Sequence, residues 1–143
     1  MIERINVQVF LFTRNPEFKV LILKRTKEKG GFWQPISGGI EKGEKIYDTI
    51  KREVFEETGI QDIIRIFDLN YSFIFKAPIS RKLMKDICFS VELDKISDVK
   101  LSNEHNEYKW CSEKEAKNLL NWKYNIIAFK KLLKQVKKSN LQN

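Results

Sequence analysis

The sequence predicts an α/β fold in which a mixed β-sheet lies between helices on its two sides. Segments rich in β-branched and aromatic residues occur both before and after residues 45–58, a stretch without Gly or Pro that predicts a helix. The last third of the chain contributes further helical segments. With 143 residues, 42% of them hydrophobic and 12% aromatic, the chain is long enough for one domain, residues 1–143, with a substantial core.

The first two predicted strands form a hairpin. Residues 5–12 are rich in β-branched and aromatic side chains, and residues 18–25 form a nearly continuous apolar run that predicts burial on both faces. A turn signal at Arg14, Asn15 and Pro16 separates them. Arg25, at the end of the second strand, is a candidate phosphate ligand, although a cation at a strand end is more often only solvated.

The middle of the chain predicts a short strand, a glycine-rich loop and a helix. Residues 32–37 lead into the loop, and Pro35 favours an edge or irregular strand there. Residues 45–58 follow as the helix, and Gly59 stands where a helix C-terminus favours glycine.

The second half predicts more strands and then two helices. Ser112 and Glu115 have the spacing of a capping box, which predicts a helix start at this point. The predicted strands are 63–75, with a bend near 68–70, then 83–93 and 108–111; the predicted helices are 112–120 and 122–136.

Three glutamates lie close together on the helix predicted at 45–58. A rotation of about 100° per residue places Glu53, Glu56 and Glu57 within an arc of roughly 100°. Such neighbouring like charges destabilise a helix, and the macrodipole disfavours them near its C-terminus. The pattern therefore indicates a cation site, and carboxylate oxygens suit Mg²⁺, with Mn²⁺ as an alternative.

These glutamates belong to a longer motif that identifies a family resemblance. The pattern Gly-x5-Glu-x7-Arg-Glu-(apolar)-x-Glu-Glu-x-Gly-(apolar) extends from Gly38 to Ile60. It resembles the Nudix box at every defined position. The resemblance implies a Nudix α/β/α sandwich and a divalent-metal-dependent hydrolase, which cleaves a phosphoanhydride bond in a nucleoside diphosphate linked to another group.

The resemblance also implies roles for individual residues of the box. The family varies in which phosphorus is attacked and in which acid is the base. Glu56 and Glu57 would be the principal metal ligands, and the carbonyl of Gly38 or Gly39 would be a further ligand. Glu53 would be a ligand or the general base. Arg52 would orient the carboxylates, and Glu44 would support the loop.

Candidate site residues also lie outside the box. In Nudix proteins the approach to the box lies beside the substrate, so Trp33 and Gln34 are candidate substrate contacts; Trp33 either stacks on a base or packs in the core. Glu104 is a candidate further acid of the metal site, with Glu107 as the competitor. His105, the only histidine, is expected to be structural or exposed rather than catalytic.

A weaker resemblance concerns the branch of the family. The order Glu104-His105, Trp110, a capped helix, then Trp122 and Asn125 is similar to the dATP and dihydroneopterin triphosphate pyrophosphohydrolases. It implies a (d)NTP or pterin triphosphate substrate, cleaved to monophosphate and pyrophosphate. RNA 5′-end and dinucleoside polyphosphate hydrolases usually have Trp-Gln-x-Pro-x-Gly-Gly, whereas Pro35 here follows Gln34 directly. Those activities, and a nucleotide-binding sensor without catalysis, remain the alternatives.

Charge and composition limit the partners. The chain has 27 Lys+Arg against 19 Asp+Glu, a net charge of +8 that favours an anionic, phosphorylated ligand. The densest basic cluster, Lys130 to Lys138, is expected to be a solvated helix face, with an RNA-binding surface as the alternative. Two cysteines without metal-like spacing, no membrane-length apolar run and no signal-peptide layout favour a cytoplasmic protein. We expect it to be a monomer or a homodimer.

Overall fold

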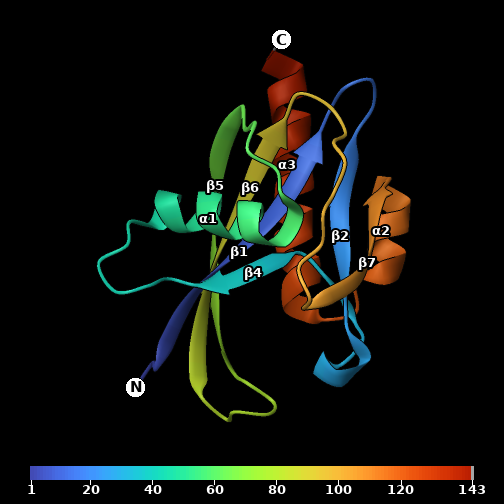
Figure 1. Cartoon of the computed structure of the whole chain (residues 1–143). Coiled ribbons are helices and arrows are strands. Elements are labelled where there is room, and N and C mark those ends of the chain that lie inside the picture. Colours follow the sequence, from blue (N-terminus) through green and yellow to red (C-terminus); the bar gives the residue numbers. More distant parts are fainter. Residues whose placement is uncertain (143) are drawn as a thin grey trace.

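The computed structural model describes residues 1–142, with side chains described to residue 139. Figure 1 shows a twisted sheet with one helix crossing in front of it and the C-terminal helix behind it. This arrangement confirms the predicted mixed sheet between helices. The elements are β1 Arg4–Thr13, β2 Lys19–Arg25, a 3-10 turn Lys27–Lys29, β3 Trp33–Gln34, β4 Ile36–Gly39, α1 Ile46–Thr58, β5 Arg65–Lys76, β6 Leu83–Leu93, β7 His105–Cys111, α2 Glu113–Leu119 and α3 Lys123–Gln142.

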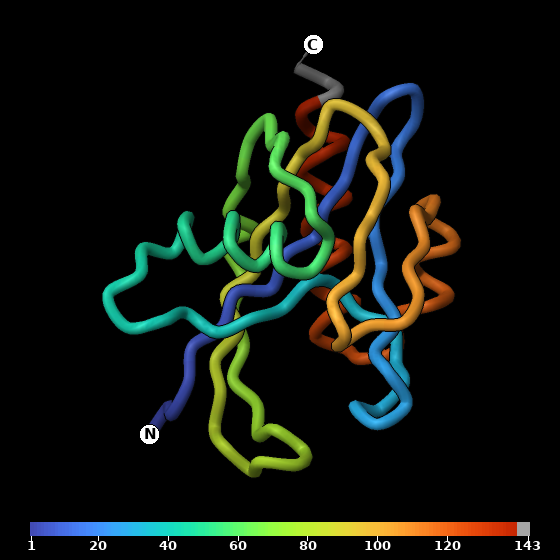
Figure 2. Tube along the Cα trace, viewed as in Figure 1, coloured from blue at the N-terminus to red at the C-terminus, as the bar shows by residue number. Residues whose placement is uncertain are grey.

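Strand β1 is the centre of the sheet. It runs parallel to β6 over ten residue pairs, from Arg4 opposite Met84 to Thr13 opposite Leu93, and antiparallel to β2 and β4. The strand path is β3-β2-β1-β6-β5, with β4 also paired to β1 and β7 to β2. The path of the chain between these strands can be followed in Figure 2.

Pro35 divides the approach to the glycine loop into two strands. Before it, β3 pairs with β2; after it, β4 crosses to pair with β1, where Gly38 lies opposite Val7. Because proline has no N–H to donate, it interrupts the ladder at this point. The predicted irregular strand is thus two short strands with different partners.

Alternation along β1 generates two hydrophobic cores. Val7, Val9 and Leu11 face α1, whereas Phe10 and Phe12 face α3, because successive side chains of a strand point to opposite faces. Helix α1 buries one apolar stripe on the first core, and α3 buries another on the second. The positions of both helices on the sheet are therefore fixed by packing.

Three element boundaries depend on more than the local pattern. β5 and β6 shift register between Asp68 and Ser72, and Asn70 has a φ of 53°, which confirms the predicted bend. β7 begins at His105, three residues before the predicted start at 108, because its polar first residues pair with the end of β2. α3 continues six residues beyond the predicted end at 136, through a lysine-rich segment without a helix breaker.

None of the helices within residues 1–142 is long and apolar enough to cross a membrane.

Candidate active site

Helix α1 carries the acids of the box along the rim of the core. Gly59 ends the helix in the left-handed region, with a φ of 76°, and its N–H donates to the carbonyl of Phe55 at 2.8 Å. This conformation costs glycine little, so the predicted helix stop is confirmed. Glu53 and Glu57 are buried on the helix face next to the core, while Glu56 is exposed.

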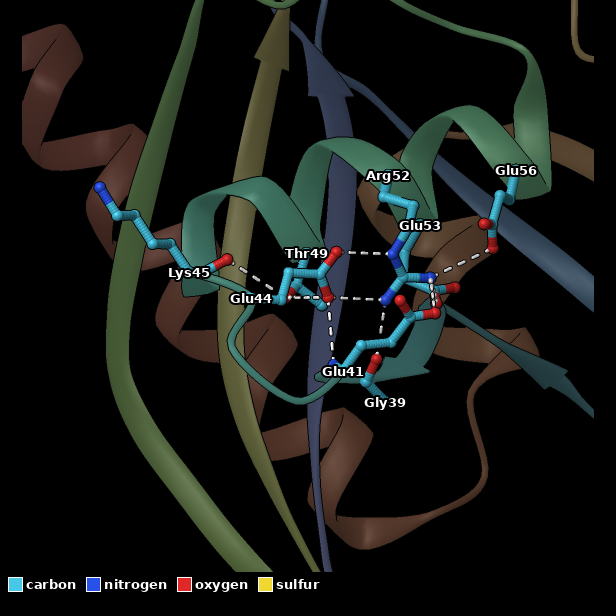
Figure 3. A network of polar contacts seen from close by, with 8 residues as sticks. All are labelled: Gly39, Glu41, Glu44, Lys45, Thr49, Arg52, Glu53 and Glu56. Carbon is cyan, nitrogen blue, oxygen red and sulfur yellow. Dashed lines mark hydrogen bonds and ion pairs between the residues drawn. The ribbon is translucent and has the colours of Figure 1, made fainter.

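Arg52 joins the glycine loop to α1, as Figure 3 shows. Its Nε donates to Oε2 of Glu44 at 2.7 Å, and its Nη2 donates to Oε1 of Glu44 and to the carbonyl of Gly39, both at 2.9 Å. Its Nη1 reaches Glu53 at 2.7 Å and Glu56 at 3.3 Å. One guanidinium therefore fixes the loop against two of the box acids.

Glu44 is held from two sides. Besides Arg52, the hydroxyl of Thr49 donates to its Oε1 at 2.7 Å. Hydrogen bonds from Arg52 and Thr49 lower the pKa of Glu44 to about 2, and the hydrogen bond to Glu44 raises the pKa of Arg52 above its usual value. The pair is therefore charged at neutral pH.

The carboxyl group of Glu53 lies directly against Gly38. A Cβ at Gly38 would overlap the Glu53 carboxyl, so any larger residue there would force this carboxyl to move. Burial raises the pKa of Glu53 to about 7, although the hydrogen bond and charge of Arg52 act in the opposite direction. The nearby charges of Glu56 and Glu57 add to the increase. Glu53 thus titrates near neutral pH.

Glu57 has a different environment. Its Oε2 contacts Nδ1 of His105 at 3.0 Å and accepts from the hydroxyl of Ser102 at 2.8 Å. Burial alone would raise the pKa of Glu57, but the hydrogen bonds from His105 and Ser102 outweigh it and hold the pKa below its usual value. Glu57 is therefore ionised when Glu53 begins to titrate, so two neighbouring glutamates have opposite pKa shifts.

Two candidate site residues outside the box lie on opposite faces of β3. Gln34 points toward α1 and contacts His105, whereas Trp33 lies on the other face, where Nζ of Lys24 is 5.9 Å from its ring. Alternation along a strand requires this separation.

The remaining candidates lie at the end of β2 and in and just before β7. Arg25 is half-buried, with its guanidinium 5.9 Å from the ring of Phe32 and its buried Nε without a partner in the structure. The Glu104 carboxylate pairs with Nζ of Lys29 at 3.1 Å. Its competitor Glu107 pairs with Lys24 at 3.3 Å.

Sequence reasoning missed the contacts of His105 and Ser102 with Glu57. His105 is 5% exposed and joins α1 to β3, a buried structural position rather than an exposed one. Glu57 and His105 are 48 positions apart, and no local pattern reports which residue of a strand will face a helix. Its position as the only histidine, next to a candidate acid, was the available signal.

The residues of α1 suit a divalent cation in chemistry and in placement. Among residues with described side chains, no three His, Cys, Asp or Glu groups converge as a finished metal cage. Yet Glu53 and Glu56 both approach one cationic nitrogen, Nη1 of Arg52, so their oxygens can already surround a positive charge. Carboxylate and backbone carbonyl oxygens are the ligands that hard divalent ions prefer.

Comparison with known proteins places this site in a family. The family model of the NUDIX domain matches residues 3–130. A NUDIX hydrolase from Listeria monocytogenes superimposes with a TM-score of 0.81 and 28% identity, covering 96% of this chain and 97% of that one. The chain therefore belongs to the NUDIX domain family, and its class is that of Nudix hydrolases acting on phosphoanhydride bonds.

Individual relatives differ in activity. The chain is 29% identical over 139 residues to dihydroneopterin triphosphate diphosphatase of Haemophilus influenzae, covering 90% of this chain and 86% of that protein. It is 34% identical over 97 residues to an octanoyltransferase of Myxococcus xanthus, where 68% of this chain aligns with only 27% of the relative's length. RNA pyrophosphohydrolases and asymmetrical bis(5′-nucleosyl)-tetraphosphatases are also among the relatives. The comparisons thus define the class but not the branch.

Proposed function

We propose that this protein is a divalent-metal-dependent pyrophosphohydrolase that cleaves a nucleoside or pterin triphosphate to a monophosphate and pyrophosphate. The observation that carries the proposal is the arrangement of Glu53 and Glu56 around Arg52, with the carboxyl of Glu53 against Gly38. The similarity to the Haemophilus dihydroneopterin triphosphate diphosphatase supports the choice of substrate class.

Glu56, Glu57 and the carbonyl of Gly38 would hold the cation, Mg²⁺ or Mn²⁺, with Glu53 adjoining them. When bound, a divalent ion neutralises phosphate charge and acidifies a coordinated water. Arg52 fixes Glu53 and Glu56 and holds the glycine loop against the helix. The net charge of +8 favours the approach of a polyphosphate.

Glu53 is the residue best suited to receive the proton of the attacking water. Its pKa of about 7 allows it to be unprotonated at neutral pH and still basic enough to accept a proton. In this reaction the water oxygen forms a bond to phosphorus, the bridging P–O bond breaks, and pyrophosphate leaves while Glu53 holds the proton. Glu57, with a lowered pKa, would remain an anionic ligand throughout.

The substrate is tested with purified protein, Mg²⁺ and a panel of dNTPs, NTPs, dihydroneopterin triphosphate, dinucleoside polyphosphates and 5′-triphosphate RNA. Pyrophosphate and phosphate are measured separately. We expect pyrophosphate from one class of triphosphate and no accumulation of free phosphate. Saturable nucleotide binding without any hydrolysis would instead indicate a nucleotide sensor.

An RNA 5′-end hydrolase is the second candidate, because α3 presents a row of exposed lysines and RNA pyrophosphohydrolases are among the relatives. If RNA is the substrate, its binding should weaken steeply with salt, since each phosphate contact releases counterions. Replacing the five lysines by glutamine should then reduce activity on RNA but not on a free triphosphate. Equal effects on both substrates would exclude this role for the helix. The lysines are Lys130, Lys131, Lys134, Lys137 and Lys138.

A further inference from the structure

A buried chain of polar contacts connects three separate elements beside the proposed metal site. Nε2 of Gln34 on β3 lies 3.2 Å from Nε2 of His105 on β7. Nδ1 of the same imidazole lies 3.0 Å from Oε2 of Glu57 on α1. The side chains of His105 and Glu57 are only 2% and 6% exposed, so water contributes little to holding this carboxylate in place.

The two contacts fix where the imidazole carries its proton. A carboxylate only accepts hydrogen bonds, so Nδ1 of His105 must donate to Glu57. The amide nitrogen of Gln34 only donates, so Nε2 of His105 must accept. Of the two tautomers of an imidazole, Gln34 therefore favours the one that has its proton on the side of Glu57.

Both donors to Glu57 act on the same oxygen atom. The hydroxyl of Ser102 donates to Oε2 at 2.8 Å, and Nδ1 of His105 donates to that atom as well. Neither of these two donors acts on Oε1. The carboxylate is thus fixed through one oxygen, and the other is left for a ligand.

We propose that His105 is a positioning residue: oriented by Gln34, it holds Oε2 of Glu57 so that Oε1 alone binds the divalent cation. This inference rests on the proposed function, because it assigns Glu57 as a metal ligand. Hydrogen bonds of this kind orient metal ligands in other proteins, and their loss lowers metal affinity by about 10–100-fold.

The test measures Mn²⁺ binding to the protein without substrate, by the electron paramagnetic resonance signal of free Mn²⁺. His105→Leu removes the donor, whereas His105→Asn places an amide N–H near the position of Nδ1. We expect His105→Leu to weaken Mn²⁺ binding by about 10-fold or more, and His105→Asn to stay close to wild type. Thr13→Val, a change at a buried residue near the far end of β1, should leave binding unchanged.

Folding and kinetics separate positioning from general stability. Circular dichroism and thermal unfolding without Mn²⁺ show which variants are folded. If His105→Leu does not fold, Gln34→Leu tests the same chain of contacts, and this variant should also weaken Mn²⁺ binding. At saturating Mn²⁺ the KM for substrate should match wild type, while the Mn²⁺ concentration needed for half-maximal activity should rise.

The inference is overturned if folded His105→Leu binds Mn²⁺ like wild type, or if His105→Asn loses as much affinity as His105→Leu. In either case wild type would still bind Mn²⁺ and hydrolyse substrate, so the proposed function would stand. Absence of both Mn²⁺ binding and hydrolysis in wild type would instead refute the proposed function together with the inference.

Discussion

Gly38 lies directly against the carboxyl of Glu53. Any side chain at position 38 would displace the carboxyl of Glu53, because a Cβ there would overlap it. Gly43, in the same loop, has no atom within 4 Å of the corresponding position, although its φ of +79° also favours glycine. The two glycines therefore separate the effect of displacing an acid from the effect of backbone strain.

We expect Gly38→Ala to reduce kcat/KM by about 100-fold, because displacing a catalytic group by about 1 Å costs that much. Gly43→Ala should lose about 1–2 kcal/mol of stability to left-handed strain and keep its activity. Steady-state kinetics and thermal unfolding of both variants check this. Equal losses of activity in the two variants would mean that position 38 has no special relation to Glu53.

The pKa of Glu53 gives the stability of the metal-free protein a defined pH dependence. Because this pKa is raised from 4.5 to about 7 in the folded state, the folded protein holds the proton more tightly than the unfolded chain. The stabilisation from Glu53 is complete below about pH 4.5 and is lost as the pH rises through about 7.

Between these pH values the free energy of unfolding of wild type should therefore fall relative to that of Glu53→Gln, by up to about 1.4 kcal/mol per pH unit. Urea unfolding at several pH values, with a chelator present, measures the difference. A difference that stays constant from pH 4.5 to 7 would show that Glu53 titrates normally.

At the scale of elements, Glu44 and Arg52 join the loop to α1. The guanidinium donates to both oxygens of Glu44 and to the Gly39 carbonyl, so it connects the loop to the helix, which has no side-chain cap at Lys45. Because the pKa of Glu44 is lowered to about 2, its stabilisation is present above about pH 4.5 and is lost as the pH falls toward 2.

A double-mutant cycle tests this connection. Glu44→Gln and Arg52→Met should each lower the melting temperature by roughly 2–4 °C at pH 7. The melting temperature of the double variant should fall by much less than the sum of the two single decreases, because either change removes the same ion pair. Glu44→Gln should also flatten the loss of stability below pH 4.5. Additive losses would show that the two residues act independently.

Some elements of the fold could be predicted from the sequence, whereas others could not. Helix α1 and its glycine stop could be predicted because periodicity, spacing and the terminal Gly59 are local signals. The two strands on either side of Pro35 could not be separated, since each is defined by its partner strand. The start of β7 at His105 was missed for the same reason, and with it the contact to Glu57.

In the whole molecule, the sheet brings together acids and donors from distant parts of the chain. β4 delivers Gly38 to α1 through its pairing with β1, while β7 delivers His105 through its pairing with β2. The box alone predicted the acids and Arg52, but not Ser102 and His105, which hold Glu57. The site is therefore a product of both the local helix and the topology of the sheet.

The central claim is that the glutamates of α1 hold the cation that drives pyrophosphate release. The most direct measurement is the Mg²⁺ dependence of pyrophosphate release from the best substrate of the panel, for wild type, Glu57→Gln and Glu113→Gln, a control at a half-buried glutamate of α2. We expect wild type and the control to require Mg²⁺, to lose activity with a chelator and to recover it when Mg²⁺ is restored. Glu57→Gln should be folded and at least about 100-fold slower. Pyrophosphate release by Glu57→Gln at the wild-type rate, or by wild type with the chelator present, would contradict the account.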